Sequence, residues 1–432
     1  MHMEDTHRFQ LRIARDSLMD QVLFPLCSNY PLPDLPVTPQ NKVVMYENKG
    51  KLTIDPTQAN VDYTLYDETG ATMASSQKRV DQQVVIDTKI LTREDYTFSI
   101  TAVKTQTKLT KQLLKTVTIR VTVDEDIPLT LIPETPEYNK PVNVFLQETQ
   151  SNNYYQVFDT KGNALSENTY SKTGGDLTIP TIPFTEDTVL NVKVVNKKTN
   201  QEGILITKPT VRVFPNTAVP VILNAAGGTD YNAVAELLLN ATQATTDYQL
   251  IFKDIDDDTV NKQALLNTAI GNSGKGKSDG TALSLKTTKL TEDLTVAVLA
   301  TKRDSKLQRE LTTIVFIPVK PDPSRSLIVT DPISAVGDTG TIEVLPPQRG
   351  VYYQLRNNAT NAEVGWRRYY HKNYGIGRAR IGVEFAVDTA PDDTVFLATG
   401  PVNVETVFNV YAVKATTGMA TQLKQLVTLK IG

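Results

Sequence analysis

Apolar and polar residues alternate in short runs along most of the chain, and this period of two predicts β-strands that each bury one face. Within residues 51–65, a strand, a turn and the start of a second strand follow one another, and the same pattern returns three times. In each copy an apolar residue stands 11 positions before a tyrosine, and a glutamine stands five positions before the same tyrosine. The four sets are Leu52, Gln58 and Tyr63; Val144, Gln150 and Tyr155; Leu237, Gln243 and Tyr248; and Ile342, Gln348 and Tyr353. Such self-similarity predicts tandem domains.

A second alternating segment closes every copy and predicts a β-hairpin. In the first copy it comprises Tyr96, Phe98, Ile100 and Ala102, then Val117, Ile119 and Val121. In the others it comprises Leu190, Val192 and Val194 to Val211 and Val213; Val296, Val298 and Ala300 to Val315 and Ile317; and Phe408, Val410 and Ala412 to Leu429 and Ile431. Strands with one buried and one solvated face are typical of two-sheet sandwiches. We therefore predict an all-β fold.

Short proline-bearing segments separate the copies and set the predicted domain limits. The prediction is an N-terminal helical arm and proline-rich connector at 1–39, followed by four sandwiches at 40–125, 126–215, 216–320 and 321–432. We call these four sandwiches repeats 1 to 4. Proline joints restrict hinge motion more than Gly/Ser linkers do, so the pattern favours a semi-rigid spacer.

Residues 5–24 predict an amphipathic helix that ends at Pro25. Its apolar stripe consists of Leu11, Ala14, Leu18 and Val22. Alternation over residues 9–13 also allows a short strand before the helix. Because a lone helix of this length has little to bury against, the stripe is expected to dock on repeat 1, on another copy or on a partner.

Residues 91–103 resemble the penultimate-strand motif of fibronectin type III domains, with Tyr96 at the place of their tyrosine corner. The sequence of this segment is Leu-Thr-Arg-Glu-Asp-Tyr-Thr-Phe-Ser-Ile-Thr-Ala-Val. The other copies depart from that motif, with Thr188, Leu294 and Thr406 at this position. Over residues 40–432 the whole pattern is similar to the immunoglobulin-like repeats of large bacterial surface adhesins. The resemblance implies tandem immunoglobulin-like or fibronectin type III-like sandwiches, and it specifies fold better than function.

Composition excludes several functional classes. The chain holds 45 basic and 48 acidic side chains, a net charge of −3, so no global field attracts nucleic acid or an anionic membrane. Cys27 is the only cysteine, which excludes an intrachain disulfide. The histidines are His2, His7 and His371, too scattered for a multi-histidine metal site or a catalytic triad. We predict no enzyme activity and no cofactor, and there is no transmembrane run.

Residues 271–278 match the phosphate-loop expression G-x-x-x-x-G-K-S. That loop must leave a strand and open a helix, so that backbone amides converge on the phosphates. Here Leu283 and Leu285 follow Gly280 in strand alternation. The match is therefore interpreted as a lengthened Gly-rich turn of the repeat.

An acidic cluster follows the Tyr248 strand and is a weak candidate for calcium binding, because alternating carboxylates can supply several oxygen ligands. It comprises Asp254, Asp256, Asp257 and Asp258. The glycine and the terminal glutamate of a helix-loop-helix calcium site are missing, which favours a solvated acidic loop instead.

Residues 365–380 form the most distinctive stretch and contain the only tryptophan. The candidate partner-binding residues are Trp366, Arg367, Arg368, Tyr369, Tyr370 and Arg378. Such side chains dominate binding hot spots. A protein partner is favoured over a glycan, and nucleic acid comes last. The alternative is a β-hairpin that covers an edge of repeat 4.

The sequence thus predicts a non-enzymatic structural and interaction protein whose partners are other proteins of a larger assembly. No signal-peptide pattern is seen, because Arg12, Arg15 and Asp16 interrupt the apolar N-terminal residues. We expect synthesis in the cytoplasm and incorporation into a phage or phage-tail-like injection particle, as an adaptor, baseplate or fibre component. The alternative is a secreted adhesin or glycan-binding protein at the cell surface.

Overall fold

The computed structural model describes residues 30–432 except 77–81, 94, 226, 258–259, 365, 372–374 and 380–393. By its contacts the chain divides into two compact units. The first comprises Met1–Thr135, Pro141–Pro183 and Asp187–Val211, and the second comprises Pro136–Lys140, Phe184–Glu186 and Arg212–Gly432. The predicted helical arm lies outside the described residues.

Repeat 1 is a sandwich of two sheets, and both are antiparallel except at one edge. The smaller sheet has the order β1 (Val37–Pro39), β3 (Lys49–Ile54), β6 (Val84–Ile90). The larger has the order β2 (Val43–Val44), β9 (Val117–Val121), β7 (Asp95–Lys104), β4 (Val61–Tyr66), β5 (Thr72–Ser76), with β8 (Thr110–Gln112) on the far half of β7. The exception is β2, which pairs in parallel with the closing strand β9.

Repeat 2 follows the same plan. One sheet has the order β10 (Leu129–Ile132), β11 (Asn143–Thr149), β14 (Gly175–Pro180). The other has the order β13 (Thr169–Ser171), β12 (Asn153–Phe158), β16 (Asn191–Asn196), β17 (Glu202–Ile204), and β15 (Thr188–Val189) pairs with β18 (Thr210–Val211). The closing strand is shorter than predicted, because it ends at Val211 and not at Val213.

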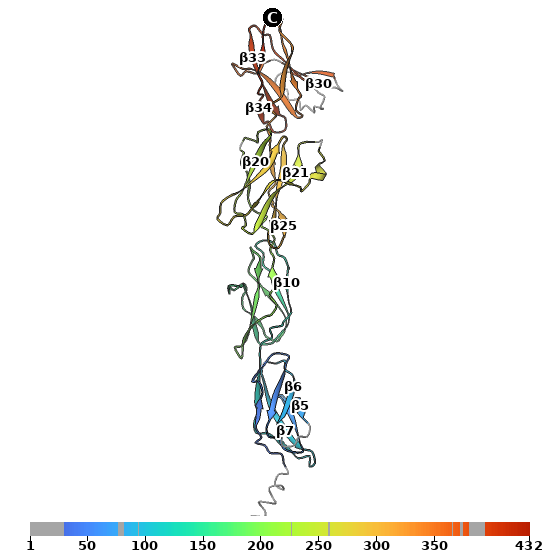
Figure 1. Ribbon diagram of the computed structural model, residues 1–432, viewed down its shortest axis with the longest axis vertical. Coiled ribbons are helices and arrows are strands. Elements are labelled where there is room, and N and C mark those ends of the chain that lie inside the picture. The colour runs from blue at the N-terminus through green and yellow to red at the C-terminus, as the bar shows by residue number, and fades with distance from the viewer. Residues whose placement is uncertain are drawn as a thin grey trace, which may run out of the picture. The chain divides into compact units, whose positions relative to one another are not determined.

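Repeat 3 repeats this arrangement and contains the only helix among the described residues, the single turn α2 (Lys262–Leu265). Its smaller sheet has the order β19 (Val221–Leu223), β20 (Ala233–Leu239), β23 (Leu283–Leu290). Its larger sheet has the order β22 (Ala269–Lys275), β21 (Thr246–Ile255), β24 (Leu294–Lys302), β25 (Gln308–Glu310), with β26 (Val315–Ile317) also on β24. Figure 1 labels β20, β21 and β25 in this sandwich.

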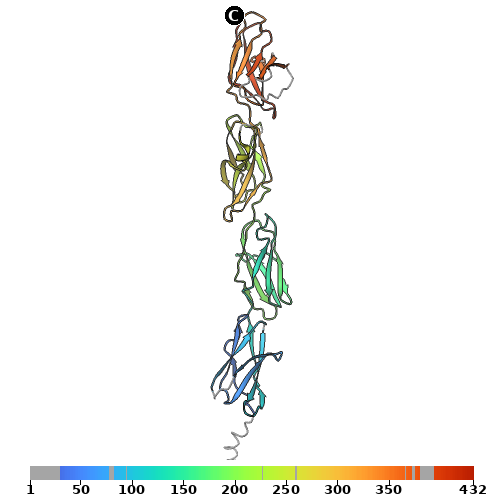
Figure 2. The ribbon, with the colours of Figure 1, turned by 90° about the vertical axis from the view of Figure 1, so that its right-hand side faces the viewer.

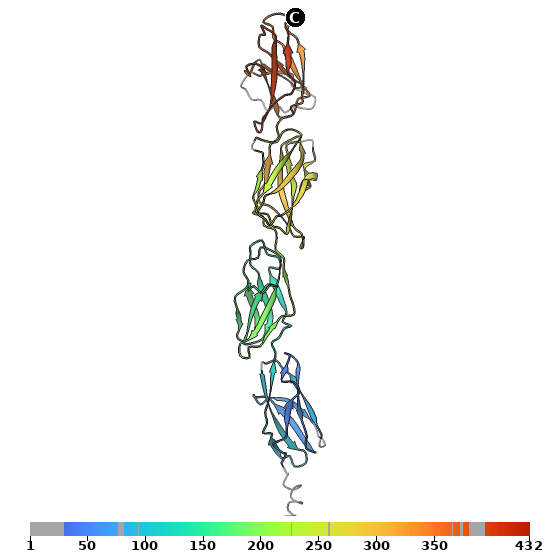
Figure 3. The same ribbon diagram turned by 60° about the vertical axis from the view of Figure 1, so that its left-hand side comes forward.

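Repeat 4 differs by a hairpin that widens one sheet. That sheet has the order β27 (Ser326–Asp331), β28 (Thr341–Leu345), β32 (Thr394–Ala398), β30 (Trp366–His371), β31 (Gly375–Ala379). The other has the order β29 (Val351–Asn357), β33 (Thr406–Lys414), β34 (Ala420–Gln422), with β35 (Val427–Leu429) on β33. The two layers of each sandwich can be followed in Figures 2 and 3. The predicted all-β fold of four tandem sandwiches is confirmed.

Inward-facing residues of both sheets form a separate core in each sandwich, as the alternation predicts. In β4, for example, Val61, Tyr63 and Leu65 are fully buried while the residues between them are partly exposed. Fully burying one such side chain contributes roughly 1.5–3 kcal/mol, so the alternating pattern supplies most of the driving force for each sandwich. The cores need no disulfide.

The repeated tyrosine is buried in every sandwich, with at most 1% of its surface exposed. Its hydroxyl accepts a hydrogen bond from the backbone N–H of the glutamine five residues earlier. The N–H to hydroxyl distances are 2.9 Å for Gln58 to Tyr63, 3.3 Å for Gln150 to Tyr155, 3.0 Å for Gln243 to Tyr248 and 2.8 Å for Gln348 to Tyr353. A buried N–H needs an acceptor, which explains the constant spacing of the two residues.

The same glutamine ties the incoming linker to its sandwich. Its side-chain Oε1 accepts a backbone N–H from the linker at 2.7–2.8 Å in every repeat. The pairs are Leu32 to Gln58, Asp124 to Gln150, Asn216 to Gln243 and Asp322 to Gln348. A second tie recurs in the closing hairpin, where N–H groups donate to linker carbonyls in the pairs Leu114 to Pro33, Ile206 to Glu125, Thr312 to Thr217 and Lys424 to Pro323. Each linker is therefore held at two points.

Tyr96 forms the tyrosine corner that the sequence predicts for repeat 1. Its hydroxyl accepts the backbone N–H groups of Thr92 at 3.0 Å and Arg93 at 3.2 Å. The Arg93 guanidinium lies over the Tyr96 ring, 4.5 Å from its centre, and pairs with Asp67 at 2.7 Å. The corner fixes the loop that precedes β7.

Alkaline pH is expected to destabilise repeats 2 and 4 through their buried tyrosines. Burial raises the pKa of Tyr155 and Tyr353 to about 12, whereas an unfolded tyrosine ionises near pH 10. Between about pH 10 and 12 the folded state keeps a proton that the unfolded state has lost, so the free energy of unfolding falls as pH rises, by about 1.4 kcal/mol per pH unit for each tyrosine.

Chemical denaturation from pH 8 to 12 measures this loss. The control is Tyr353→Phe, which should cost about 1–3 kcal/mol at pH 8 because the Gln348 N–H loses its acceptor. It should also make the alkaline decline of repeat 4 shallower. Equal declines in both proteins would contradict the assignment.

Candidate functional site

A charged cluster lies where the linker enters repeat 3, within the second unit. Lys302 ends β24 with only 2% of its side chain exposed, and its Nζ donates to Glu186 Oε2 at 2.6 Å and to Thr245 Oγ1 at 3.2 Å. Gln243 Nε2 donates to the Thr185 carbonyl at 3.1 Å and to Glu186 Oε1 at 3.3 Å. One carboxylate is thus held by an ammonium group and an amide together.

Repeat 4 has the same cluster with a second carboxylate. Lys414 Nζ donates to Asp293 Oδ1 at 2.9 Å and to Glu292 Oε2 at 3.2 Å, while Gln348 Nε2 donates to Glu292 Oε1 at 3.3 Å. Asp293 Oδ1 also accepts the Val319 N–H at 2.6 Å. Burial raises the pKa of Glu292, and the Lys414 ammonium opposes that rise. The ammonium lies buried between two acidic groups.

Repeat 2 replaces the charged cluster with neutral amides. Asn196 stands where the other repeats carry a lysine, and its Nδ2 donates to Asn153 Oδ1 at 2.9 Å. Asn153 Nδ2 in turn donates to Gln150 Oε1 at 2.9 Å. The geometry of the glutamine is kept while the charge is removed.

These lysines were missed in the sequence, although a signal for them exists. An alanine, one further residue and a lysine end the penultimate strand at 102–104, 300–302 and 412–414, whereas repeat 2 has Val-Val-Asn at 194–196. Each lysine lies opposite a residue two positions before the repeated tyrosine, in the pairs Lys104 with Val61, Lys302 with Thr246 and Lys414 with Val351.

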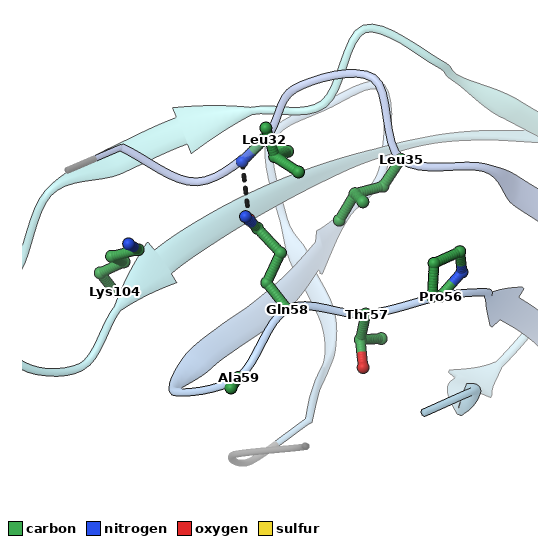
Figure 4. Close-up of a pocket in the computed structure, with 7 residues that line it drawn as sticks. All are labelled: Leu32, Leu35, Pro56, Thr57, Gln58, Ala59 and Lys104. Atoms are coloured by element: carbon green, nitrogen blue, oxygen red, sulfur yellow. Dashed lines mark hydrogen bonds between the residues drawn. The ribbon is translucent and has the colours of Figure 1, made fainter. Parts of the chain in front are cut away.

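In repeat 1 the equivalent end carries an open pocket of about 440 Å³. It is lined by Leu32, Leu35, Pro56, Thr57, Gln58, Ala59 and Lys104 (Figure 4). The Leu32 N–H donates to Gln58 Oε1 at 2.7 Å between two of these lining residues. The pocket therefore combines apolar walls with the amide and ammonium groups that bind carboxylates in repeats 3 and 4. We call it the repeat 1 pocket.

The acidic cluster of repeat 3 lies partly outside the described residues, because Asp258 is not among them. Asp254 pairs with Lys262 at 3.2 Å, and the Asp256 N–H donates to the Asp293 carbonyl. Within the described part of the chain, no three His, Cys, Asp or Glu side chains gather as metal ligands. The weak calcium proposal for Asp254, Asp256, Asp257 and Asp258 remains a prediction.

The phosphate-loop match has no phosphate-loop structure, as the strand alternation predicts. The interpretation as a turn is wrong in part, since Gly271–Lys275 belongs to strand β22 and only the residues after it form the turn. Strand β23, not a helix, follows. Gly271 has φ +72°, and a Cβ there would come within 1.9 Å of the Lys286 carbonyl oxygen. The glycine serves close backbone packing.

The aromatic and basic stretch of repeat 4 forms the hairpin β30–β31 on the edge of a sheet. In its backbone register Arg367 lies opposite Leu397 of β32, and Arg368 lies opposite Arg378 of β31. The chain segment with Trp366, Arg367, Arg368, Tyr369, Tyr370 and Arg378 is thus placed on one sheet edge. Its binding role remains a prediction.

Comparison with known proteins gives structural matches alone. No protein-family model and no curated protein matches the chain. The ICAM-5 D1–D4 ectodomain fragment covers 92% of this chain and 99% of its own, at 11% identity and a TM-score of 0.40. A tetra-tandem repeat in the extending region of a large adhesion protein covers 92% and 100%, at 10% identity and a TM-score of 0.35. The four N-terminal Ig domains of Dscam1 isoform 6.44 cover 92% and 100%, at 9% identity and a TM-score of 0.22.

The chain is a tandem array of immunoglobulin-like sandwiches. The strand orders of the four repeats carry this assignment. At these identities and TM-scores the matches add nothing on function, which is argued from the contacts of the chain itself. Among the described residues, no helix has the length and apolar character needed to cross a membrane.

Replacing Lys414 with Met is expected to destabilise the second unit. Without the ammonium, Asp293 is left buried at 1% exposure beside Glu292, and breaking a buried pair in this way costs about 3–5 kcal/mol. Denaturation followed by hydrogen exchange of β33 measures the loss.

The matched control is Lys193→Met in repeat 2, which removes an ion pair to Glu202 at 37% and 57% side-chain exposure. It should cost at most about 1 kcal/mol. A double variant that adds Asp293→Asn should recover part of the Lys414→Met loss. Equal losses at Lys414 and Lys193 would contradict the buried cluster.

Proposed function

We propose that the protein is a non-enzymatic spacer and adaptor in a larger assembly. The observation that carries this proposal is the repeated pair of ties between linker and sandwich, which recurs in all four repeats. Fixing each linker at two points limits the freedom of the chain between domains, a property that a spacer needs and a flexible tether lacks. The charged clusters at Lys302 and Lys414 add further contacts near two of these linkers.

Within this class, we favour a component of a phage or phage-tail-like contractile injection particle, as an adaptor, baseplate or fibre part. The lone cysteine supports this choice, because sandwiches that need no disulfide can fold in a reducing cytoplasm, where such particles would be assembled. The stripe of Leu11, Ala14, Leu18 and Val22 would dock the protein on the particle.

The second candidate is a surface adhesin or glycan-binding protein. The aromatic and basic composition of residues 365–380 favours it, because tryptophan, tyrosine and arginine side chains stack on sugars as well as on proteins. In this case the hairpin of repeat 4 would hold the ligand.

Sedimentation of a native lysate separates the two candidates. We expect the protein to travel with fast-sedimenting particles, and crosslinks from residues 11–22 should join it to a particle protein. Recovery as a free or membrane-attached molecule would overturn the particle proposal and favour the adhesin.

The hairpin is expected to act as a binding site in either case. Replacing Trp366, Arg367 and Tyr370 together with alanine should weaken binding to the assembly or ligand by about tenfold or more, since hot-spot residues each carry more than about 1 kcal/mol. Binding is measured by co-sedimentation or by surface retention. The control is Phe316→Ala in repeat 3, an aromatic residue that is 51% exposed. Unchanged binding, or loss of the repeat 4 fold, would count against the assignment.

A further inference from the structure

Two of the repeats hold a glutamate with the same pair of groups. In repeat 3 these groups are Gln243 Nε2 and Lys302 Nζ, which bind Glu186 at 3.3 Å and 2.6 Å. In repeat 4 the equivalent groups of Gln348 and Lys414 bind Glu292 at 3.3 Å and 3.2 Å. The lysine side chains are only 2–3% exposed, whereas the side chains of Glu186 and Glu292 are 45% and 24% exposed, so each buried ammonium group meets a carboxylate at the edge of the sandwich.

The glutamate comes from the same place in each case. Glu186 and Glu292 both lie in the loop before the penultimate strand of the preceding sequence repeat, two residues before Thr188 and Leu294. Those two residues occupy equivalent positions, since Thr188 pairs with Val211 and Leu294 pairs with Ile317 of the closing strands. The binding groups and the glutamate loop are therefore two halves of one recurring contact.

Repeat 1 carries the binding half of this contact. Gln58 accepts the linker N–H as its equivalents do, and Lys104 stands at the register position of Lys302 and Lys414. Both line the repeat 1 pocket together with the apolar side chains of Leu32 and Leu35. Among the described residues, no loop of this kind precedes repeat 1.

We propose that the repeat 1 pocket binds a glutamate-bearing loop of an immunoglobulin-like sandwich that a partner protein supplies. The proposal rests on the proposed role in an assembly and names the chemistry of one docking end. Lys104 need not give up its present partner, because an ammonium group has three hydrogens and Lys302 already serves two acceptors.

A second copy of this chain fits the pocket less well. The last repeat carries Val404 two residues before Thr406, which pairs with Leu429 of the closing strand. Val404 is 68% exposed and stands where Glu186 and Glu292 stand in their repeats. End-to-end contact between copies would therefore place a valine where the glutamine amide and the lysine together bind a glutamate, and would leave only Glu405, at the position of Asp293, to meet Lys104.

Site-specific photo-crosslinking tests the proposal in cells that make the native assembly. A photoreactive benzoylphenylalanine replaces Ala59, which lines the repeat 1 pocket beside Gln58. The matched control is the same replacement of Ala244, which follows Gln243 as Ala59 follows Gln58. At Ala244 the probe should reach the loop of this chain around Glu186, which shows that the chemistry reports the contact.

We expect the probe at Ala59 to crosslink a loop of a partner sandwich, mapped by mass spectrometry to within a few residues of a glutamate. Lys104→Glu should lower the yield by about tenfold or more, the factor that corresponds to about 1.4 kcal/mol. Changing the mapped glutamate to lysine should restore it. Lys104→Gln serves as a milder variant, and an unchanged melting temperature shows that repeat 1 remains folded.

Crosslinks to residues 1–29 of the same chain, to a second copy or to a surface without a glutamate would overturn the proposal. The proposal would also be overturned if the probe at position 59 gave no crosslink while the probe at position 244 did. Co-sedimentation with particles that persists in those cases would leave the spacer function standing, so the two failures are distinguishable.

Discussion

The hydrogen bond between the glutamine N–H and the buried tyrosine hydroxyl is the constraint on which the other features depend. A buried backbone N–H without an acceptor costs about 1–3 kcal/mol, so the turn before each tyrosine strand keeps one conformation. That conformation presents the glutamine side chain to the incoming linker, as in the bond from Asp322 to Gln348. One core residue thereby sets the turn, the linker contact and the site beside it.

The sites built on this constraint share geometry but differ in charge. Repeat 2 uses the neutral pair Asn153 and Asn196, repeat 3 adds one carboxylate from Glu186, and repeat 4 adds two from Glu292 and Asp293. A buried ion pair adds little net stability compared with apolar packing, but it strongly penalises a mismatched partner. The buried charges therefore determine which surfaces can pair, while the cores around the repeated tyrosines provide the stability of each sandwich.

The fold was predictable because its signal is local. Alternation and the Gln-to-Tyr spacing lie within about a dozen residues, and the turn bond at Tyr63 enforces that spacing. The charged clusters at Lys302 and Lys414 were not predictable from the sequence. Lys302 and Glu186, for example, are 116 residues apart, and in the sequence each looks like an ordinary surface charge. The prediction of a turn was wrong for strand β22. Gly271 is required there because the backbone of Lys286 packs too close to leave room for a Cβ atom, and not because the chain turns.

In three sandwiches, a segment that follows the first strand pairs in parallel with the closing segment, and this pairing has a mechanical consequence. In repeat 1, β2 runs parallel to β9, and single parallel bridges join Thr229 to Val319 and Ile333 to Ile431 in repeats 3 and 4. A pull on the two ends of such a domain would load these parallel pairings in shear, along the direction of the strands. These parallel pairings would thus resist tension at the point where the chain enters each of the three sandwiches.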